Sequence, residues 1–541
     1  MKSKLQALGM SLSRIGLGTV ALLTALVMLF IFLSSMLGTV DMSTDNPMKE
    51  KVTFQDDPFF MNLLLLVLSL LFGVLSILYV RVTPWGKRLT ANKIAFGVGL
   101  WVFLAGSAWV LMAMSSPTED SLAVTRAGIF AAMDDLHYLE EVYFQRFPFQ
   151  TGYVLWTELW ARVFDMDFRN YILLEILNVL CLAVGEWALV MTADRLFRRT
   201  DVTFATGMML CLFFQPMLFS TFLYGNLPGF GFACLAVYFF VEYLRRGRWE
   251  WLVPSGASLL ISIMLKLNNM ILLVAMGIIL LAHLLRGKPV RRALALILLC
   301  ASVIPMTNLP KACYEARLGK DLGEGIPMTS WMAMGLNESP IAPGWYNGKY
   351  TVSNFHAVDM NTEDASENSK QVIKERLEHF KKEPAEALQF FKKKILSQWN
   401  ETTFQSIWTN QVRGQFMTRI GLAKYACEEG EDDVKAVMDG GVQFIYFGMT
   451  VASFYLLYEQ YRKKEHRRSV EPALYLIPLI ILGGFLYHAL FEAKSQYAIT
   501  YVILMIPYAA WGACKLASTC KLLLFPLYEK YVGKQKKLVR K

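Results

Sequence analysis

Charge is scarce in this chain of 541 residues: only 18% of them are Asp, Glu, Lys or Arg, whereas 55% are hydrophobic. The mean hydropathy is +0.37. A soluble chain of this length would need a larger polar surface. The composition therefore excludes an ordinary soluble protein, and the long apolar runs indicate that lipid is the main solvent.

Several catalytic signatures are missing from the sequence. The absence of a P-loop argues against an ATP-driven pump acting alone, and the absence of HExxH and Gly-x-Ser-x-Gly disfavours proteases and hydrolases. No CxxC motif or His/Cys cluster suggests zinc or an iron–sulfur centre. Acidic residues within apolar runs are few and no inverted repeat is evident, which weakens a secondary-transporter interpretation.

Most of the 8 cysteines lie in or beside apolar runs, where we predict that they act as small hydrophobic residues. Cys313 and Cys427 differ, because they fall in the largest polar segment. They could pair if that segment faces an oxidising compartment, although their spacing does not require it.

The apolar runs are long enough to cross a bilayer, because a helix rises ~1.5 Å per residue across a core of ~30 Å. The first run, 15–37, follows Lys2, Lys4 and Arg14 and is too long for the core of a signal peptide. We predict an all-α polytopic membrane protein with about twelve spanning helices. They are expected at 15–38, 60–80, 94–115, 171–193, 204–220, 227–244, 251–265, 270–285, 293–309, 442–459, 472–489 and 497–516.

The net charge of +10 is concentrated in short connections between these runs, at 81–88, 195–199, 245–248, 286–292 and 461–468. Basic connections face the cytoplasm in membrane proteins. The charge therefore predicts a multi-pass protein of the cell membrane with cytoplasmic N- and C-termini. Nucleic acid is not an expected partner, and membrane lipids are.

The spans divide the chain into parts. The amphipathic stretch 369–398 in the large polar segment predicts a helical pair interrupted at Pro384. We predict two extra N-terminal spans at 1–93, a core at 94–309 with a first outer loop at 116–170, a non-cytoplasmic loop domain at 310–440, C-terminal spans at 441–520 and a basic cytoplasmic tail at 521–541.

The first outer loop carries two adjacent carboxylates, Asp134 and Asp135, with His137 and Tyr138 just behind them. Adjacent carboxylates can hold a divalent cation such as Mg²⁺ or Mn²⁺, or one can act as a base while the other positions a donor. The alternative is an exposed helix N-terminus, where Asp is favoured without any catalytic role.

The run Asp134-Asp135-Leu136-His137-Tyr138 resembles the Asp-Glu-x-x-Tyr motif in the first outer loop of GT-C glycosyltransferases. These multi-span enzymes use polyprenyl-phosphate sugars and include protein O-mannosyltransferases and lipid A aminoarabinose transferases. The resemblance implies that Asp134 is the essential catalytic carboxylate, with Asp135 standing where Glu is usual. It also implies a GT-C-like fold with a large non-cytoplasmic loop domain.

Shorter likenesses follow along the chain. The stretch 146–155 resembles a Pro-containing turn of the family, which reads Tyr-Pro-Asn-Asn in many Gram-positive members; here Phe149 and Gln150 differ. Leu336-Asn337 and the stretch 344–347 resemble Gly-Leu-Asn and Gly-Trp-Tyr-Asn patterns of the large outer loop. The stretch 491–497 is similar to a Glu-x-x-x-Arg-Tyr helix start, with Gln496 in place of Arg and Lys494 as the alternative cation.

A lipid-phosphate sugar needs cations near the headgroup, a carboxylate near the sugar and aromatic faces for the ring. Several of the candidate positions can also be explained without a ligand. Lys266 could extend its ammonium to the membrane interface, residues 225–226 could simply form a Gly-Asn turn, and the aromatic residues could anchor the chain at the interface. The candidate substrate-binding residues are His137, Tyr138, Arg146, Gln150, Tyr224, Asn226, Lys266, Asn269, Trp345, Tyr346, Glu492, Lys494 and Gln496.

Together these features predict a membrane glycosyltransferase that moves a hexose from a polyprenyl-phosphate carrier to a cell-surface glycan, lipid or protein on the outer face. Asp134 would take the proton of the acceptor hydroxyl, and the anomeric centre would invert. The alternatives are a transporter or flippase of a lipid-linked saccharide, and a polymerase or ligase of surface polysaccharide. The enzyme interpretation requires Asp134 to converge with Lys494 or Arg146 on one outward cavity.

Overall fold

The computed structural model describes residues 2–42, 50–57, 59–167, 171–286, 291–413, 418–465 and 471–538, and helices dominate it. Within these residues, 10 helices are long and apolar enough to cross a membrane, or up to 11 if one bent pair is a single span. The predicted fold class, an all-α polytopic membrane protein, is thereby confirmed. The spans are built on α1 (Lys2–Ser35), α2 (Phe59–Val82), α3 (Ala91–Ala113), α7 (Ile172–Phe197), α10 (Asn226–Arg246), α12 (Met270–Leu285), α13 (Arg291–Met306), α21 (Glu431–Glu465), α22 (Leu476–Leu490) and α23 (Ser495–Leu538).

Two predicted spans differ from expectation. The run at 204–220 is the bent pair, with α8 (Thr200–Leu212) followed by a helical stretch that begins with α9 (Gln215–Leu218) at an angle of 41°. Pro216 near the start of α9 lacks the amide proton that a continuous helix would need. The run at 251–265 is α11 (Trp249–Leu265), whose 17 residues reach ~26 Å, short of a ~30 Å core.

Close helix packing in the membrane depends on small residues. A Cβ atom on Gly512 of α23 would lie 2.1 Å from the carbonyl oxygen of Gly448 on α21. A Cβ on Gly448 would in turn lie 2.6 Å from the carbonyl oxygen of Ala509. Any larger side chain would force α21 and α23 apart, as expected where helices associate by backbone contact in lipid.

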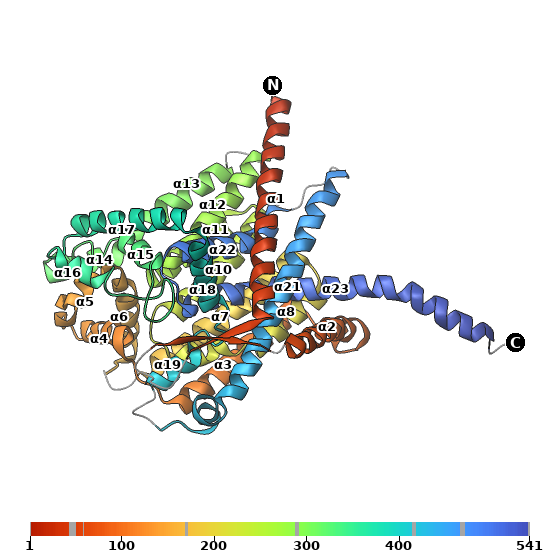
Figure 1. The fold of residues 1–541 in the computed structure, drawn as a ribbon, viewed down its shortest axis with the longest axis horizontal. Helices are drawn as coiled ribbons and strands as arrows, with labels where there is room; N and C mark the ends of the chain where they lie inside the picture. Colours follow the sequence, from red (N-terminus) through yellow and green to blue (C-terminus); the bar gives the residue numbers. More distant parts are fainter. Residues whose placement is uncertain are drawn as a thin grey trace.

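Several shorter helices pack beside the long ones. Figure 1 shows α4 (Glu119–Ala132), α5 (Val142–Arg146) and α6 (Thr151–Phe164) on the left beside α14 to α17, whereas the C-terminal end of α23 extends away on the right. The second group, which we call the loop domain, comprises α14 (Leu309–Leu318), α15 (Met328–Gly335), α16 (Val352–Ala357), α17 (Thr362–Lys382), α18 (Pro384–Trp399), α19 (Ser406–Arg413) and α20 (Gly421–Lys424). Short helical turns are η1 (Gly86–Arg88), η2 (His137–Glu140), η3 (Pro148–Gln150), η4 (Phe219–Thr221), η5 (Leu267–Asn269), η6 (Tyr425–Glu429) and η7 (Pro472–Tyr475).

The predicted amphipathic pair is present as α17 and α18. Pro384 is the first residue of α18, a position where proline's missing amide proton costs nothing. Phe380 of α17 and Phe390 of α18 pack together with ring centroids 5.3 Å apart, which buries the apolar faces of the pair against each other.

The N-terminal spans carry a small hairpin into the loop domain. Strands β1 (Gly38–Met42) and β2 (Val52–Asp56) pair antiparallel, with Val40 opposite Phe54. The amide of Val40 donates to the carbonyl of Asn400, which directly follows α18, at 3.0 Å. The hairpin therefore places Glu50, two residues before β2, beside the loop domain, where its Oε1 accepts from Gln405 at 3.1 Å.

Candidate functional site

Lys266 lies at the break between α11 and α12, enclosed by aromatic rings. Its Nζ is 4.8 Å from the ring centroid of Tyr224 and 5.1 Å from that of Tyr497. Burial lowers the pKa of Lys266 to about 8, against the opposing pull of the Glu492 charge. An ammonium held between aromatic faces in a poorly hydrated place is suited to binding an anion.

The break itself is built by polar side chains that close the chain reversal. Asn269 donates from Nδ2 to the Ser262 hydroxyl at 2.8 Å and to the Ser262 carbonyl at 3.2 Å. Gly225 of the neighbouring reversal lies so close that a Cβ there would be 1.7 Å from the carbonyl oxygen of Leu265. These contacts bring Tyr224 over Lys266 and explain why Asn269 is buried.

The turn between α22 and α23 supplies a carboxylate and a second lysine. Tyr497 donates its phenolic hydrogen to Oε2 of Glu492 at 2.9 Å. Lys494 Nζ lies 2.6 Å from Oε1 of Glu50, just before β2. Burial raises the pKa of Glu492; burial alone would lower the pKa of Lys494, but the charges of Glu50 and Glu492 outweigh it and raise that pKa. We call Tyr224, Lys266, Glu492, Lys494 and Tyr497 the lysine cluster.

Lys394 of α18 connects the loop domain to the turn between α22 and α23 through hydrogen bonds. Its fully buried Nζ donates to the carbonyl oxygens of Gly335, Ala489 and Phe491, the last two at 3.0 and 2.7 Å. All three ammonium hydrogens thus have acceptors. Lys394 therefore positions the loop domain against the lysine cluster, a role that the sequence did not suggest.

The prediction that both Trp345 and Tyr346 could stack on a sugar needs correction. Trp345 is fully buried, and its indole Nε1 donates to Ser397 Oγ at 2.8 Å. It packs in a core with Val40 of β1 and Ala493 of the turn, so no sugar can reach its ring. Tyr346 is 41% exposed, and the charges of Asp120 and Glu492 act on its hydroxyl. Only Tyr346 of this pair can face a ligand.

Asp120 is an exposed carboxylate that is not among the predicted site residues, and its charge acts on the lysine cluster. It lies in the first turn of α4, between Thr118 and Ser121, whose reciprocal hydrogen bonds form a capping box at the start of the helix. The negative charge of Asp120 acts on Lys266 and Lys494 as well as on the hydroxyl groups of Tyr224 and Tyr346. Such interactions are significant only at short range or in low dielectric. The sequence signal was the helix start 117–121 directly after the third span.

Asp134 and Asp135 are bound by residues outside the lysine cluster, and their convergence with Lys494 or Arg146 remains a prediction. The Asp134 side chain is 79% exposed, and Oδ1 lies 2.6 Å from Nη2 of Arg162. The hydrogen bond and charge of Arg162 lower the pKa of Asp134. Asp135 is bound by His137, whose Nδ1 lies 2.6 Å from Oδ1 and lowers the Asp135 pKa by hydrogen bonding. Both carboxylates are thus occupied by cationic or hydrogen-bonding partners on the surface.

The other predicted residues divide between the two places. Tyr138 belongs with Asp135 and His137, under the guanidinium of Arg126 at 4.1 Å. Arg146 donates from Nε to Nε2 of His356 at 2.9 Å and so joins α5 to α16. The structure brings Gln150 to the lysine cluster, where its amide donates to the Tyr224 hydroxyl. Asn226 and Gln496 are buried at the starts of α10 and α23, within two residues of Tyr224 and Lys494.

A metal site is not evident in the described part of the chain, which holds no group of three or more His, Cys, Asp or Glu side chains able to bind an ion. Dependence on Mg²⁺ or Mn²⁺ remains a prediction. The two cysteines of the polar segment are both free, Cys313 exposed and Cys427 buried, so they do not pair here.

Glu158 of α6 holds the region around Asp134 together. This buried carboxylate accepts from the hydroxyl of Tyr314 at 2.6 Å, from Arg317 at 2.8 Å and from Arg162 at 3.0 Å. The side chains of Arg162 and Arg317 are 43% and 33% exposed, so solvent compensates part of their charge when the buried carboxylate is removed. Glu158→Gln should therefore destabilise the protein by about 1–3 kcal/mol. Thermal unfolding in detergent measures this, with Glu140→Gln, on the exposed Lys320 pair, as the control. An unchanged melting temperature for Glu158→Gln would contradict this role.

The all-α polytopic membrane fold is consistent with the fold of GT-C glycosyltransferases. In keeping with this, residues 152–308 match the family model described as dolichyl-phosphate-mannose-protein mannosyltransferase. The match supports the GT-C superfamily of membrane glycosyltransferases. The matched segment runs from α6 through α13 and includes Tyr224, Lys266 and Asn269. No curated protein matches the chain.

Proposed function

We propose that the chain is a membrane glycosyltransferase that transfers a hexose from a polyprenyl-phosphate carrier to a cell-surface glycan, lipid or protein. The observation that carries this proposal is the lysine cluster. It joins Tyr224 and Lys266 of the family-matching segment to the α22–α23 turn. It places Lys266 between two aromatic rings and Lys494 beside Glu50.

The direction of the helices supports a site on the outer face. The cluster lies at the N-terminal end of α10, whereas Arg245 and Arg246 lie in the last turn of the same helix. Arg195 likewise lies in the last turn of α7. This is the C-terminal end of α7, opposite the end that follows α6 in the chain. Basic helix ends face the cytoplasm, so we infer an outer lysine cluster, with both chain termini cytoplasmic.

The proposed reaction uses each group at a defined atom. Lys266 and Lys494 bind the lipid-linked phosphate through charge-assisted hydrogen bonds, and Tyr346 faces the sugar ring. The acceptor oxygen attacks the anomeric carbon as the bond from that carbon to the phosphate oxygen breaks. Asp120 takes the acceptor proton, and the lysines stabilise the charge on the leaving phosphate. Attack opposite the leaving group inverts the anomeric centre.

Removal of one phosphate-binding charge should weaken donor binding. Lys266→Met loses a hydrogen bond to a charged group, worth about 1.5–3 kcal/mol, and should raise the donor KM by about 10–150-fold. The measurement is loss of sugar from a panel of polyprenyl-phosphate hexoses, with purified protein in lipid nanodiscs. Lys320→Met, at an exposed pair with Glu140, is the control and should leave KM unchanged.

The same panel separates the alternatives. Sugar that crosses the bilayer of proteoliposomes while still attached to its lipid would identify a flippase. Consumption of diphosphate-linked oligosaccharides in place of monophosphate donors would identify a polymerase or ligase. Either result would overturn the proposed transferase, and chelation of divalent ions in the same assay tests metal dependence.

A further inference from the structure

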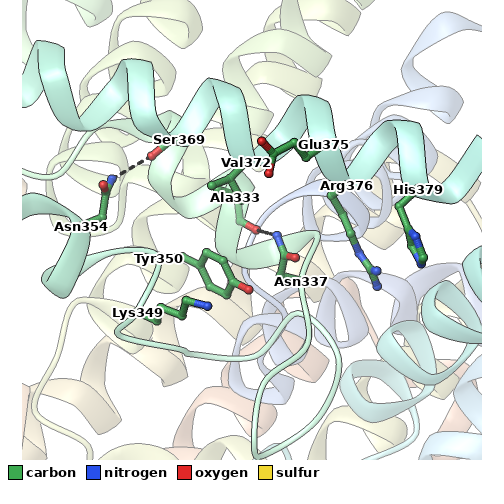
Figure 2. A pocket seen from close by; sticks show the side chains of 10 residues that line it. All are labelled: Ala333, Asn337, Lys349, Tyr350, Asn354, Ser369, Val372, Glu375, Arg376 and His379. Carbon is green, nitrogen blue, oxygen red and sulfur yellow. Dashed lines mark hydrogen bonds between the residues drawn. The ribbon is translucent and has the colours of Figure 1, made fainter.

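A pocket of ≈ 400 Å³ opens in the loop domain, and no residue of the lysine cluster lines it. Figure 2 shows it between α17 and the loop that leaves α15, with side chains from both directed toward each other. Its lining is Ala333, Asn337, Lys349, Tyr350, Asn354, Ser369, Val372, Glu375, Arg376 and His379. We call this the acceptor pocket.

One wall is a single helical face. Ser369, Val372, Arg376 and His379 are spaced three or four residues apart on α17, so their side chains form one row. The facing wall carries the ring of Tyr350, with the Lys349 ammonium 5.5 Å from the ring centroid. Asn337 and Asn354 contribute amide groups at the other sides (Figure 2).

Neighbours hold the polar groups of the pocket in place. Arg376 donates from Nε to the carbonyl of Leu336 at 3.0 Å and from Nη1 to Glu386 at 3.0 Å. Its buried Nη2 has no hydrogen-bond partner among the described residues. This Nη2 lies 3.8 Å from Oε1 of Glu338, and the guanidinium carbon lies 4.2 Å from the ring centroid of Phe380. Asn354 is fixed by a donation to Ser369 at 3.1 Å. These contacts fix the polar side chains that line the pocket before any ligand binds.

The chemistry of the lining selects the class of ligand. Carboxylate, guanidinium, ammonium and imidazole groups stand together, so the pocket is neither a simple anion site nor a simple cation site. The polar groups exclude a lipid tail, whose burial would leave them unpaired. Amides and charged groups that donate and accept hydrogen bonds, beside one aromatic ring, are suited to a neutral ligand with many hydroxyl groups.

Two short chain segments connect the pocket to Tyr346 and to the Gly335 carbonyl that Lys394 binds. Tyr350 follows Tyr346 by four residues, and such a segment spans at most ~14 Å between Cα atoms. Asn337 lies two residues after Gly335, whose carbonyl oxygen accepts from Lys394. A ligand longer than one sugar could therefore contact both places.

We propose that the acceptor pocket binds an internal hexose unit of an oligosaccharide acceptor while the terminal unit lies at the lysine cluster. This inference rests on the proposed transferase function and specifies its acceptor as a glycan in place of a protein or a lipid. It makes Tyr350 and Glu375 determinants of acceptor specificity, with no part in the reaction of the donor.

The test uses the full-length protein in nanodiscs and hexose oligosaccharides of one to six units as acceptors. We expect KM to fall as the acceptor lengthens. Tyr350→Ala and Glu375→Gln should raise the KM of the long acceptors about tenfold, the effect of losing about one good contact. The kcat, the donor KM and the KM of the single-unit acceptor should stay unchanged. Glu378→Gln, a carboxylate of the same helix that does not line the pocket, is the matched control.

Binding of the fluorescently labelled protein to an array of the same oligosaccharides provides a readout that needs no donor. Loss of array binding in Tyr350→Ala, with an unchanged melting temperature, supports the pocket even if no transfer is found, so failure of the proposed function can be told apart. Equal array binding and equal KM for the wild-type, Tyr350→Ala and Glu375→Gln proteins would overturn the inference. Length-dependent binding that only these two variants abolish would establish it.

Discussion

Asp120→Asn should abolish sugar transfer, with a fall in kcat of about 10²–10⁴-fold, the usual contribution of a general base. Asn keeps the size of the side chain but cannot take the proton of the acceptor hydroxyl. We assign the proton to Asp120 because its charge acts on Lys266, Lys494 and Tyr346 together. Release of hexose from the lipid donor, followed by mass spectrometry, measures the effect.

Asp134→Asn is the contrasting variant and should keep activity within about twofold, as expected for a surface substitution of about 0.5 kcal/mol. Glu119→Gln changes the neighbouring carboxylate in the same turn of α4 and controls for a change in helix capping. Full activity in Asp120→Asn together with a large loss in Asp134→Asn would reverse the assignment. Melting temperatures of all three proteins show whether a loss reflects unfolding.

The outline of the fold could be predicted because apolar length and charge are local properties of the sequence. The spans, the basic connections and the interruption at Pro384 all follow from periodicity and composition within about 20 residues. The two differences, a 17-residue α11 and a bend of 41° between α8 and the helical stretch at Gln215–Thr221, arise where helix length and bending depend on packing rather than on composition.

The site could be predicted only in part, since its members are distant in sequence. Lys266 and Lys494 stood out individually as cations near apolar runs, but no local pattern pairs Lys494 with Glu50 or places Tyr224 over Lys266. The motif likeness at Asp134 favoured a carboxylate that Arg162 already binds. Which residue is paired or exposed depends on tertiary packing, and a local motif such as the acidic pair at 134–135 does not contain that information.

Transfer should lose efficiency as pH rises through about 8, because burial lowers the pKa of Lys266 to about 8 from its usual 10.5. Below that pH the ammonium is charged and can bind the donor phosphate; above it, kcat/KM for the donor should fall by about tenfold per pH unit, since this parameter reports the free enzyme. The kcat should fall only at higher pH, because the negative charge of bound phosphate favours the protonated lysine and raises its pKa.

Lys266→Arg tests whether the titration of Lys266 causes the decline in kcat/KM as the pH rises through about 8. A guanidinium stays charged throughout the range, so the decline near pH 8 should disappear even if the rate at neutral pH is lower. Lys494→Arg should leave the decline in kcat/KM near pH 8 unchanged. Glu50 and Glu492 raise the pKa of Lys494, so Lys494 is already charged throughout this range. If the decline persists in Lys266→Arg, another group titrates there, and Lys266 is not the charge that captures the donor. The pH dependence would then give no support to phosphate binding by the lysine cluster.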